Sequence, residues 1–240
     1  MHRPQGRPQP QDLQRHAENL LLFIYGAQTP QEAAVKIIFA TGNQNKMREI
    51  REILADFSDE ILSMKEAGLS PEIVEDGETF DENALIKARA VYREQFRLTG
   101  ERALVLADDS GLEIDALGGA PGVYSARFMG EDTPYDIKNA ALIEKLADTP
   151  REERTARFRC AIAAVLPGGD ELLTDASVEG LIAYEPSGAN GFGYDPILFY
   201  PPRGCTLACL TDDEKNAVSH RGKALRKMRE LLADKLYLLK

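Results

Sequence analysis

The chain has 240 residues, of which 43% are hydrophobic and 28% are charged, and its formal net charge is −10. This length and composition predict one folded domain with a sizeable core. The negative charge argues against binding to a nucleic acid polymer, which requires a broad basic surface, but it does not exclude an anionic mononucleotide. Cys160, Cys205 and Cys209 suggest no disulfide framework and no zinc site, so we expect a reducing, cytoplasmic environment.

Residues 1–34 differ in kind from the rest of the chain. The first eleven residues hold three prolines and several glutamines, which is typical of disorder. Apolar residues from Leu13 to Ile24 then recur at helical spacing, which predicts a short amphipathic helix packed on the domain or on a partner. The apolar run at 20–27 is too short to span a membrane, and it makes a poor signal peptide. A misassigned start codon is the alternative.

A buried strand is predicted at residues 35–40. It leads into the polar turn Thr41-Gly42-Asn43-Gln44-Asn45-Lys46 and then into a helical pattern that includes Met47 and Ile50. Such a turn directs free backbone N–H groups and the positive end of the helix dipole at one point, where an anion binds. Lys46 adds a charge suited to phosphate. The alternative is an ordinary turn with a solvated lysine.

The next elements alternate between strand and helix. A strand is predicted at 60–64, and the capping box Thr79-Phe80-Asp81-Glu82 opens a helix. A strand at 103–106 is then closed by Ala107-Asp108-Asp109-Ser110-Gly111. Because side chains alternate along a strand, we expect one aspartate to hold local structure and the other to reach a metal or a water. A plain turn is the alternative.

The second half of the chain predicts antiparallel strands. A glycine-rich loop runs to Gly122, a helix covers about 137–146, and strands occupy 157–184 around a turn at 167–170. The segment 189–196 alternates glycines with aromatics. A second capping box at 211–214 opens a short helix, and Ser219 is suited to cap the last helix, with His220 and Arg221 on the surface near its start. The pattern predicts an α/β fold with a mixed parallel and antiparallel central sheet flanked by helices.

Five of these segments occur together in one family. They are Thr41-Gly42-Asn43…Lys46, Ala107-Asp108-Asp109-Ser110-Gly111-Leu112, Leu117-Gly118-Gly119-Ala120-Pro121-Gly122-Val123-Tyr124-Ser125-Ala126-Arg127, Gly191-Phe192-Gly193-Tyr194-Asp195-Pro196 and Ser219-His220-Arg221-Gly222. In this order they resemble the inosine triphosphate pyrophosphatase family, also called HAM1-like, whose bacterial members are dITP/XTP pyrophosphatases. The resemblance covers residues 35–240, which we expect to be the catalytic domain, and leaves out residues 1–34. Thr41 stands where serine is also common in the family, and it keeps the hydroxyl.

The resemblance implies a two-lobed fold with the active site in the cleft, and a homodimer. It implies hydrolysis of ITP, dITP and XTP to the monophosphate and pyrophosphate, which keeps deaminated purines out of DNA and RNA. By resemblance Asp109 is the proton acceptor, and Asp109 and Glu75 bind Mg²⁺; a solvated acidic loop is the alternative for Glu75. The implied substrate-binding residues are Thr41, Gly42, Asn43, Gln44, Asn45, Lys46, Ser110, Phe192, Gly193, Tyr194, Asp195, Lys215, His220 and Arg221.

Two other functional classes remain open. One is a nucleotide sensor without catalysis, which is disfavoured by the joint presence of Glu75, Asp108, Asp109 and Lys46. The other is a pyrophosphatase of modified pyrimidine nucleotides, as in the Maf-like proteins. For the purine reading, His220 and Arg221 are hydrogen-bond donors that match the keto oxygen at C6 of hypoxanthine and xanthine but not the amino group of adenine.

Overall fold

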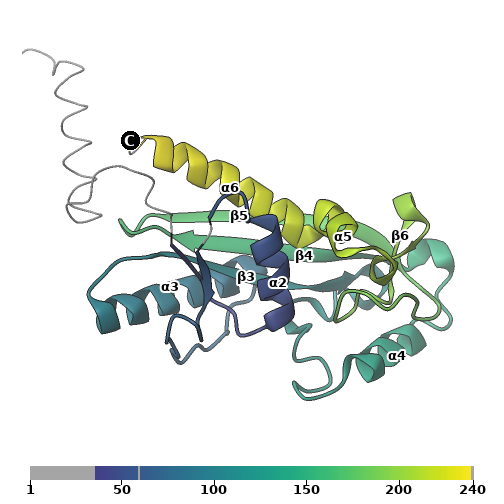
Figure 1. The fold of residues 1–240 in the computed structure, drawn as a ribbon. Helices are drawn as coiled ribbons and strands as arrows, with labels where there is room; N and C mark the ends of the chain where they lie inside the picture. The colour runs from purple at the N-terminus through teal and green to yellow at the C-terminus, as the bar shows by residue number, and fades with distance from the viewer. Residues whose placement is uncertain (1–35, 59, 239–240) are drawn as a thin grey trace, which may run out of the picture.

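The fold is built on one seven-stranded sheet. The computed structural model describes residues 36–58 and 60–238, so the predicted disorder and helix within residues 1–34 lie outside the described residues. Figure 1 shows the sheet, whose strand order is β2-β1-β3-β4-β5-β6-β7. The strands are β1 (Ile37–Phe39), β2 (Ile61–Ser63), β3 (Leu104–Ile114), β4 (Thr155–Val165), β5 (Glu171–Ile182), β6 (Leu198–Tyr200) and β7 (Cys205–Thr206).

Strand direction divides the sheet into two parts. β1 runs parallel to β2 and to β3, whereas every pairing from β3 through β7 is antiparallel. This arrangement confirms the mixed α/β sheet that the sequence predicts. Parallel strands need crossover connections, and α2 and α3 supply them here.

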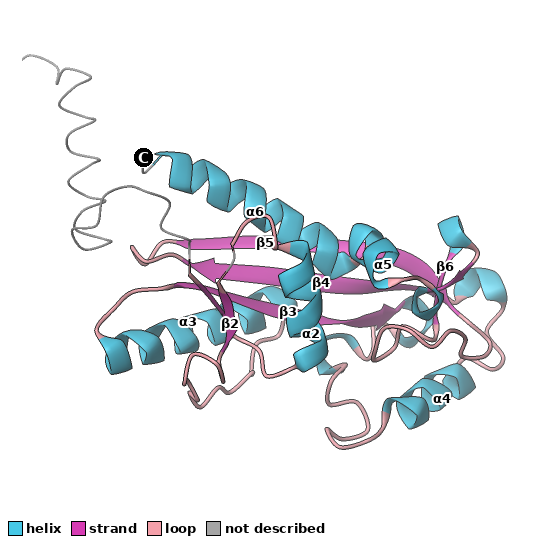
Figure 2. Ribbon diagram, in the orientation of Figure 1, coloured by secondary structure: helices cyan, strands magenta, loops and turns pink. Residues whose placement is uncertain are grey.

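Helices cover both faces of the sheet (Figure 2). They are α2 (Gln44–Ile53), α3 (Phe80–Thr99), α4 (Tyr135–Lys145), α5 (Asp212–Val218) and α6 (His220–Leu238). The side chains of α2 and α6 share a core with one face of β3 and β4, and α3 packs on the opposite face. A third core joins α4 to the far end of the sheet. Among the helices at 36–58 and 60–238, none is long and apolar enough to cross a membrane.

Local signals in the sequence form as predicted. Thr79 and Thr211 each accept a hydrogen bond from the backbone N–H three residues on. The glutamate at that position accepts the backbone N–H of the threonine, so both capping boxes are present. Ser219 Oγ accepts the N–H of Gly222 at 3.0 Å and caps α6. Cys160 is fully buried in β4, where the alternating pattern predicts a core residue.

One boundary prediction is wrong. The strand at 103–106 does not end before Asp108, because β3 continues without a turn to Ile114. Asp109 pairs with Ala161 and Gly111 with Arg159 along the antiparallel ladder to β4. Residues that favour turns therefore lie inside a long strand, since β4 pairs with β3 without a break from Val165 to Ala156.

Candidate active site

A cavity of about 440 Å³ opens where the sheet changes from parallel to antiparallel pairing. Its walls come from the β1–α2 turn, β3, α3, the loop after Gly122, the loop at 192–195, and the start of α6. The cavity brings together all the residues that the sequence assigns to the site except two. Gln44 and Asn45 do not line it and are exposed on the first turn of α2.

The two aspartates of β3 face different partners, as the strand alternation predicts. Asp108 is buried, and its Oδ2 accepts from Lys46 Nζ at 2.9 Å and from Arg221 Nη2 at 3.0 Å. Ser110 Oγ lies 3.3 Å from the same oxygen and accepts from Arg221 at 2.9 Å. Burial opposes the charge, but Lys46 and Arg221 outweigh it and hold the pKa of Asp108 well below its usual range. Asp108 therefore organises two cations through Oδ2, whereas its buried Oδ1 has no hydrogen-bond partner among the described residues.

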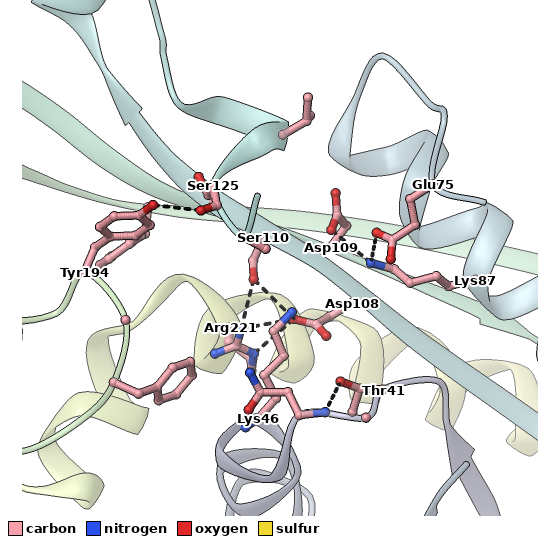
Figure 3. A pocket seen from close by; sticks show the side chains of 18 of the residues that line it. Thr41, Lys46, Glu75, Lys87, Asp108, Asp109, Ser110, Ser125, Tyr194 and Arg221 are labelled. Atoms are coloured by element: carbon pink, nitrogen blue, oxygen red, sulfur yellow. Dashed lines mark hydrogen bonds and ion pairs between the residues drawn. The ribbon is translucent and has the colours of Figure 1, made fainter. Parts of the chain in front are cut away.

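Asp109 lies on the other face of β3, toward α3 (Figure 3). Lys87 Nζ, from the buried side of α3, is 2.9 Å from Asp109 Oδ1 and 2.8 Å from Glu75 Oε2. Burial raises the pKa of Asp109, and Lys87 only partly offsets it. Asp109 Oδ2 is buried and has no hydrogen-bond partner among the described residues. One oxygen of the carboxylate is thus fixed, and the other is free.

A buried ionic network lies behind the cavity. Glu49 on α2 accepts from Lys215 Nζ at 2.7 Å and from Arg221 Nη1 at 2.6 Å. Lys215 also pairs with Asp195. The prediction that His220 and Arg221 are surface residues is wrong, because both are buried. The carboxylate partners of Arg221 come from α2 and β3, so nothing near Arg221 in the sequence reveals its burial.

His220 has no charged partner of its own. Its ring stacks on Phe158 with centroids 4.8 Å apart, and its Nδ1 lacks a hydrogen-bond partner within the described parts of the chain. Burial, with Arg221 and Lys215 nearby, lowers the pKa of His220 well below 6.5. The imidazole is therefore neutral at physiological pH, with one donor and one acceptor nitrogen.

The loop at 192–195 is held from inside the cavity. Asp195 Oδ2 accepts the N–H of Phe192 at 2.8 Å, and Lys215 Nζ lies 4.6 Å from the centroid of the Phe192 ring. Phe192 keeps a partly exposed ring, whereas Tyr194 is buried and donates its hydroxyl to Ser125 O at 2.7 Å. Of these two aromatic residues of the loop, Phe192 is thus the more exposed and Tyr194 is the buried one.

The β1–α2 turn is tighter than the sequence predicts. Asn43 Oδ1 caps α2 by accepting the N–H groups of Asn45 and Lys46, and Thr41 Oγ1 accepts the N–H of Asn43 at 3.2 Å. The expectation of free N–H groups is therefore wrong for Asn43, Asn45 and Lys46. The positive end of the helix and the Lys46 ammonium remain directed at the cavity.

Comparison with known proteins places the chain in a family. A model described as the Ham1 family matches residues 37–231. The chain belongs to the Ham1 family. A Clostridium perfringens Ham1 relative named dITP/XTP pyrophosphatase is 45% identical over 197 residues, 82% of this chain and 97% of the relative. A Bacillus subtilis protein of the same name is 46% identical over 195 residues, 81% of this chain and 96% of its own.

Solved Ham1 structures share the fold. A HAM1 protein from Coxiella burnetii aligns with a TM-score of 0.73 at 40% identity, over 83% of this chain and 99% of that chain. A structure named nucleoside-triphosphatase / dITP/XTP pyrophosphatase, from Mycobacterium abscessus, aligns with a TM-score of 0.62 at 42% identity, over 81% and 98%. These matches confirm both the family resemblance and the fold class.

The donor set of this Ham1 protein fits a magnesium ion. Mg²⁺ binds oxygen and commonly takes one or two carboxylates together with substrate phosphates and water. Asp109 Oδ2, buried and unpartnered, and Glu75, joined to Asp109 through Lys87, supply two such carboxylates. The described residues hold no group of three or more His, Cys, Asp or Glu side chains suited to a metal.

Sequence reasoning missed two charged residues of the site, Lys87 and Glu49. Lys87 lies three residues after Ala84 and four before Val91, on the buried side of α3, and a lysine in that pattern is a usable signal. Glu49 lies between Met47 and Ile50, both buried. Glu49 pairs with Lys215 and Arg221, which are 166 and 172 residues away in the sequence. No local sequence pattern therefore predicts its role.

Proposed function

We propose that this Ham1 protein is a nucleoside triphosphate diphosphatase that hydrolyses ITP, dITP and XTP to the monophosphate and pyrophosphate. The observation that carries the proposal is the free, buried Oδ2 of Asp109 beside a cavity that also holds Lys46 and Lys87. The names of the relatives support the substrate class. Its biological role would be to remove deaminated purine nucleotides before they enter DNA and RNA.

The proposed chemical step needs a water and a proton acceptor. Asp109 Oδ2 accepts a hydrogen bond from the water, whose oxygen attacks the α-phosphorus. The bond from this phosphorus to the bridging oxygen breaks, pyrophosphate leaves, and the water's proton moves to Asp109. A carboxylate whose pKa burial has raised is a better proton acceptor than an exposed one. Lys87 fixes the position of the other oxygen.

Cations of the cavity are suited to the triphosphate. Lys46 at the start of α2 and Arg127 at the cavity wall carry charges that phosphate oxygens can meet, and Ser110 adds a hydroxyl. When bound, Mg²⁺ would neutralise phosphate charge and supply an acidified water. Glu75 and Asp109 would hold it. Stabilisation of charge in this way is the main demand of phosphoryl transfer.

The base is proposed to lie against Phe192, near His220. An aromatic face stacks on a purine, and the unpartnered His220 can exchange a hydrogen bond with the base edge. Arg221 donates to Asp108, Glu49 and Ser110, so most of its donors are committed to the protein. We therefore propose that His220, rather than Arg221, forms the hydrogen bond to the C6 keto oxygen.

A substrate panel tests the proposal. Pyrophosphate release is measured for ITP, dITP, XTP, ATP, GTP and a pyrimidine triphosphate at matched concentrations with Mg²⁺. We expect rapid release from the first three and slow release from the others. Equal rates with ATP and ITP would contradict the proposed discrimination between hypoxanthine and adenine. Preference for a modified pyrimidine would favour the Maf-like alternative, and binding without turnover would favour a sensor.

Metal removal tests the magnesium site. EDTA is expected to abolish pyrophosphate release, and excess Mg²⁺ to restore it. The reason is that Glu75 and Asp109 outnumber Lys87, so this group of side chains has no positive charge left to neutralise a triphosphate. Full turnover in protein stripped of metal would remove Glu75 and Asp109 from the proposed coordination.

We also propose that the protein acts in the cytoplasm as a homodimer. The cysteine usage supports the compartment, and the family resemblance supports the dimer. Sedimentation analysis of the purified chain tests the oligomeric state. A mass equal to one chain at micromolar concentration would contradict it.

A further inference from the structure

One face of α4 reaches both loops that wall the nucleobase end of the cavity. Tyr135 packs edge-on against Tyr194, with ring centroids 5.0 Å apart and an interplanar angle of 85°. Asn139 Nδ2 donates to Gly193 O at 3.2 Å. Lys138, fully buried, donates to Ala126 O at 2.7 Å and lies 4.9 Å from the centroid of the Tyr135 ring.

The loop at 192–195 is therefore clamped from two sides. On the inner side, Asp195 and Lys215 fix it through charge. On the outer side, α4 fixes it through a neutral amide and an aromatic ring. Gly193 has a φ of +68°, and a Cβ there would lie 3.6 Å from Tyr135 Cε1, so the Tyr135 ring closes directly over the glycine.

Tyr135 is placed to transmit packing into the cavity. It lines the cavity and is 39% exposed, so it is neither a core residue nor a free surface residue. Its contact partner Tyr194 is tied to Ser125 O, and Ser125 in turn accepts the N–H of Leu112 on β3. Removing the Tyr135 ring leaves one side of Tyr194 and the backbone of Gly193 without support.

We propose that Tyr135 is a positioning residue for nucleobase recognition, acting through Tyr194 and Gly193. The inference rests on the proposed function, because it assigns the loop at 192–195 to the base. It separates the roles of two neighbouring regions: the β3 carboxylates and lysines act on the phosphates, and α4 sets the geometry of the base end. Loss of the ring therefore weakens binding of the base without changing the chemical step.

The test compares Tyr135→Leu and Tyr135→Phe with Ile137→Ala. Leucine keeps bulk but removes the ring, phenylalanine keeps the ring, and Ile137 is an exposed residue of the same helix that does not line the cavity. Because an edge-on aromatic pair contributes modestly, we expect Tyr135→Leu to raise KM for ITP about 3- to 10-fold with kcat within about twofold. Tyr135→Phe and Ile137→Ala should match wild type.

Product binding gives a readout that does not depend on turnover. In calorimetry, Tyr135→Leu should weaken IMP binding by a similar factor and leave pyrophosphate binding unchanged. A general loosening of the fold would weaken both products, and that result would overturn the inference, as would unchanged IMP binding. A wild-type chain that neither hydrolyses ITP nor binds IMP would instead overturn the proposed function.

Discussion

Asp108 and Asp109 are neighbours in the chain, yet their carboxyl groups have opposite surroundings. Two cations and a hydroxyl surround Asp108, and one lysine shared with Glu75 faces Asp109. The pKa of Asp108 is lowered and that of Asp109 is raised. Two groups whose environments separate their pKa values are suited to different tasks, one structural and one chemical.

Replacing Asp109 tests this division. Asp109→Asn keeps the size and the contact with Lys87 but removes the proton acceptor, so kcat should fall about 10²- to 10⁴-fold, the usual contribution of a general base. Circular dichroism and thermal melting should show an intact fold. Turnover within a few-fold of wild type would rule out the assignment of Asp109.

His220 predicts a dependence of stability on pH. Its pKa in the folded protein lies well below 6.5, because burial and the cations Arg221, Lys215 and Lys46 outweigh Asp108. Below about pH 6.5 the unfolded chain binds a proton that the folded chain rejects. As the pH decreases below about 6.5, protonation of His220 in the unfolded chain therefore lowers the free energy of unfolding. Above that pH this loss of stability is absent.

Urea denaturation at pH 7.5 and pH 5.5 measures this effect. The loss of stability between the two values should be smaller for His220→Gln than for wild type, because the variant has no imidazole to protonate. Equal losses in both proteins would contradict a neutral buried His220. The absolute stability of the variant is not diagnostic, since it also loses the stacking contact with Phe158.

Residue-level prediction from sequence succeeds where a motif is local. Asp109, Lys46 and Phe192 line one cavity, as the motifs imply. The prediction that Arg221 lies on the surface is wrong because its partners Glu49 and Asp108 are 172 and 113 residues away in the sequence. A buried charge of this kind depends on partners that only the folded chain brings together.

At the scale of elements, β3 is the informative case. Its composition after Leu106 favours a turn, but the ladder to β4 and the cation partners of its aspartates let it continue. The carboxylates of Asp108 and Asp109 are separated because successive side chains of a strand point to opposite faces, and not because the strand ends between them. The hydrophobic pattern predicted the strands up to residue 184 but missed the short strands β6 and β7, and the boundary of β3 depended on tertiary pairing.

Gly111 gives a test of this continuation. A Cβ at this position would lie 2.5 Å from Ser125 Oγ and closer still to Gly122 O, because the loop after Pro121 crosses β3 there. Gly111→Ala should therefore destabilise the protein by about 1–3 kcal/mol, as overpacking commonly does.

A matched control exists in the β4–β5 hairpin. At Gly168 a Cβ would meet nothing within 4 Å, and the residue does not have a positive φ. Gly168→Ala should leave the melting temperature nearly unchanged, while Gly111→Ala lowers it by several degrees. Equal melting temperatures for the two variants would mean that the loop does not press on β3.

At the scale of the whole molecule, the site depends on distant parts of the chain meeting at the middle of the sheet. α2, α5 and α6 bring Glu49, Lys215 and Arg221 together, and β3 contributes Asp108.

The domain boundary near residue 35 stays a prediction. A shortened chain that starts at Ala34 is expected to keep its substrate preference and most of its kcat, and assays of both chains on ITP and ATP measure this. A large loss of kcat would assign residues 1–33 to the active site or to an obligatory dimer.

The charges that surround the cavity have a thermodynamic consequence. Five cationic side chains of the lining are matched by five carboxylates, and Glu49 lies directly behind them. They are Lys46, Lys87, Arg127, Lys215 and Arg221, against Glu75, Asp108, Asp109, Glu131 and Asp195. Among the described residues there is thus no surplus of positive charge to attract a bare triphosphate. If Mg²⁺ binds as proposed, metal and nucleotide each raise the affinity for the other by the same factor, since such coupling is reciprocal. On that proposal, the protein would select the metal complex of the nucleotide over either component alone.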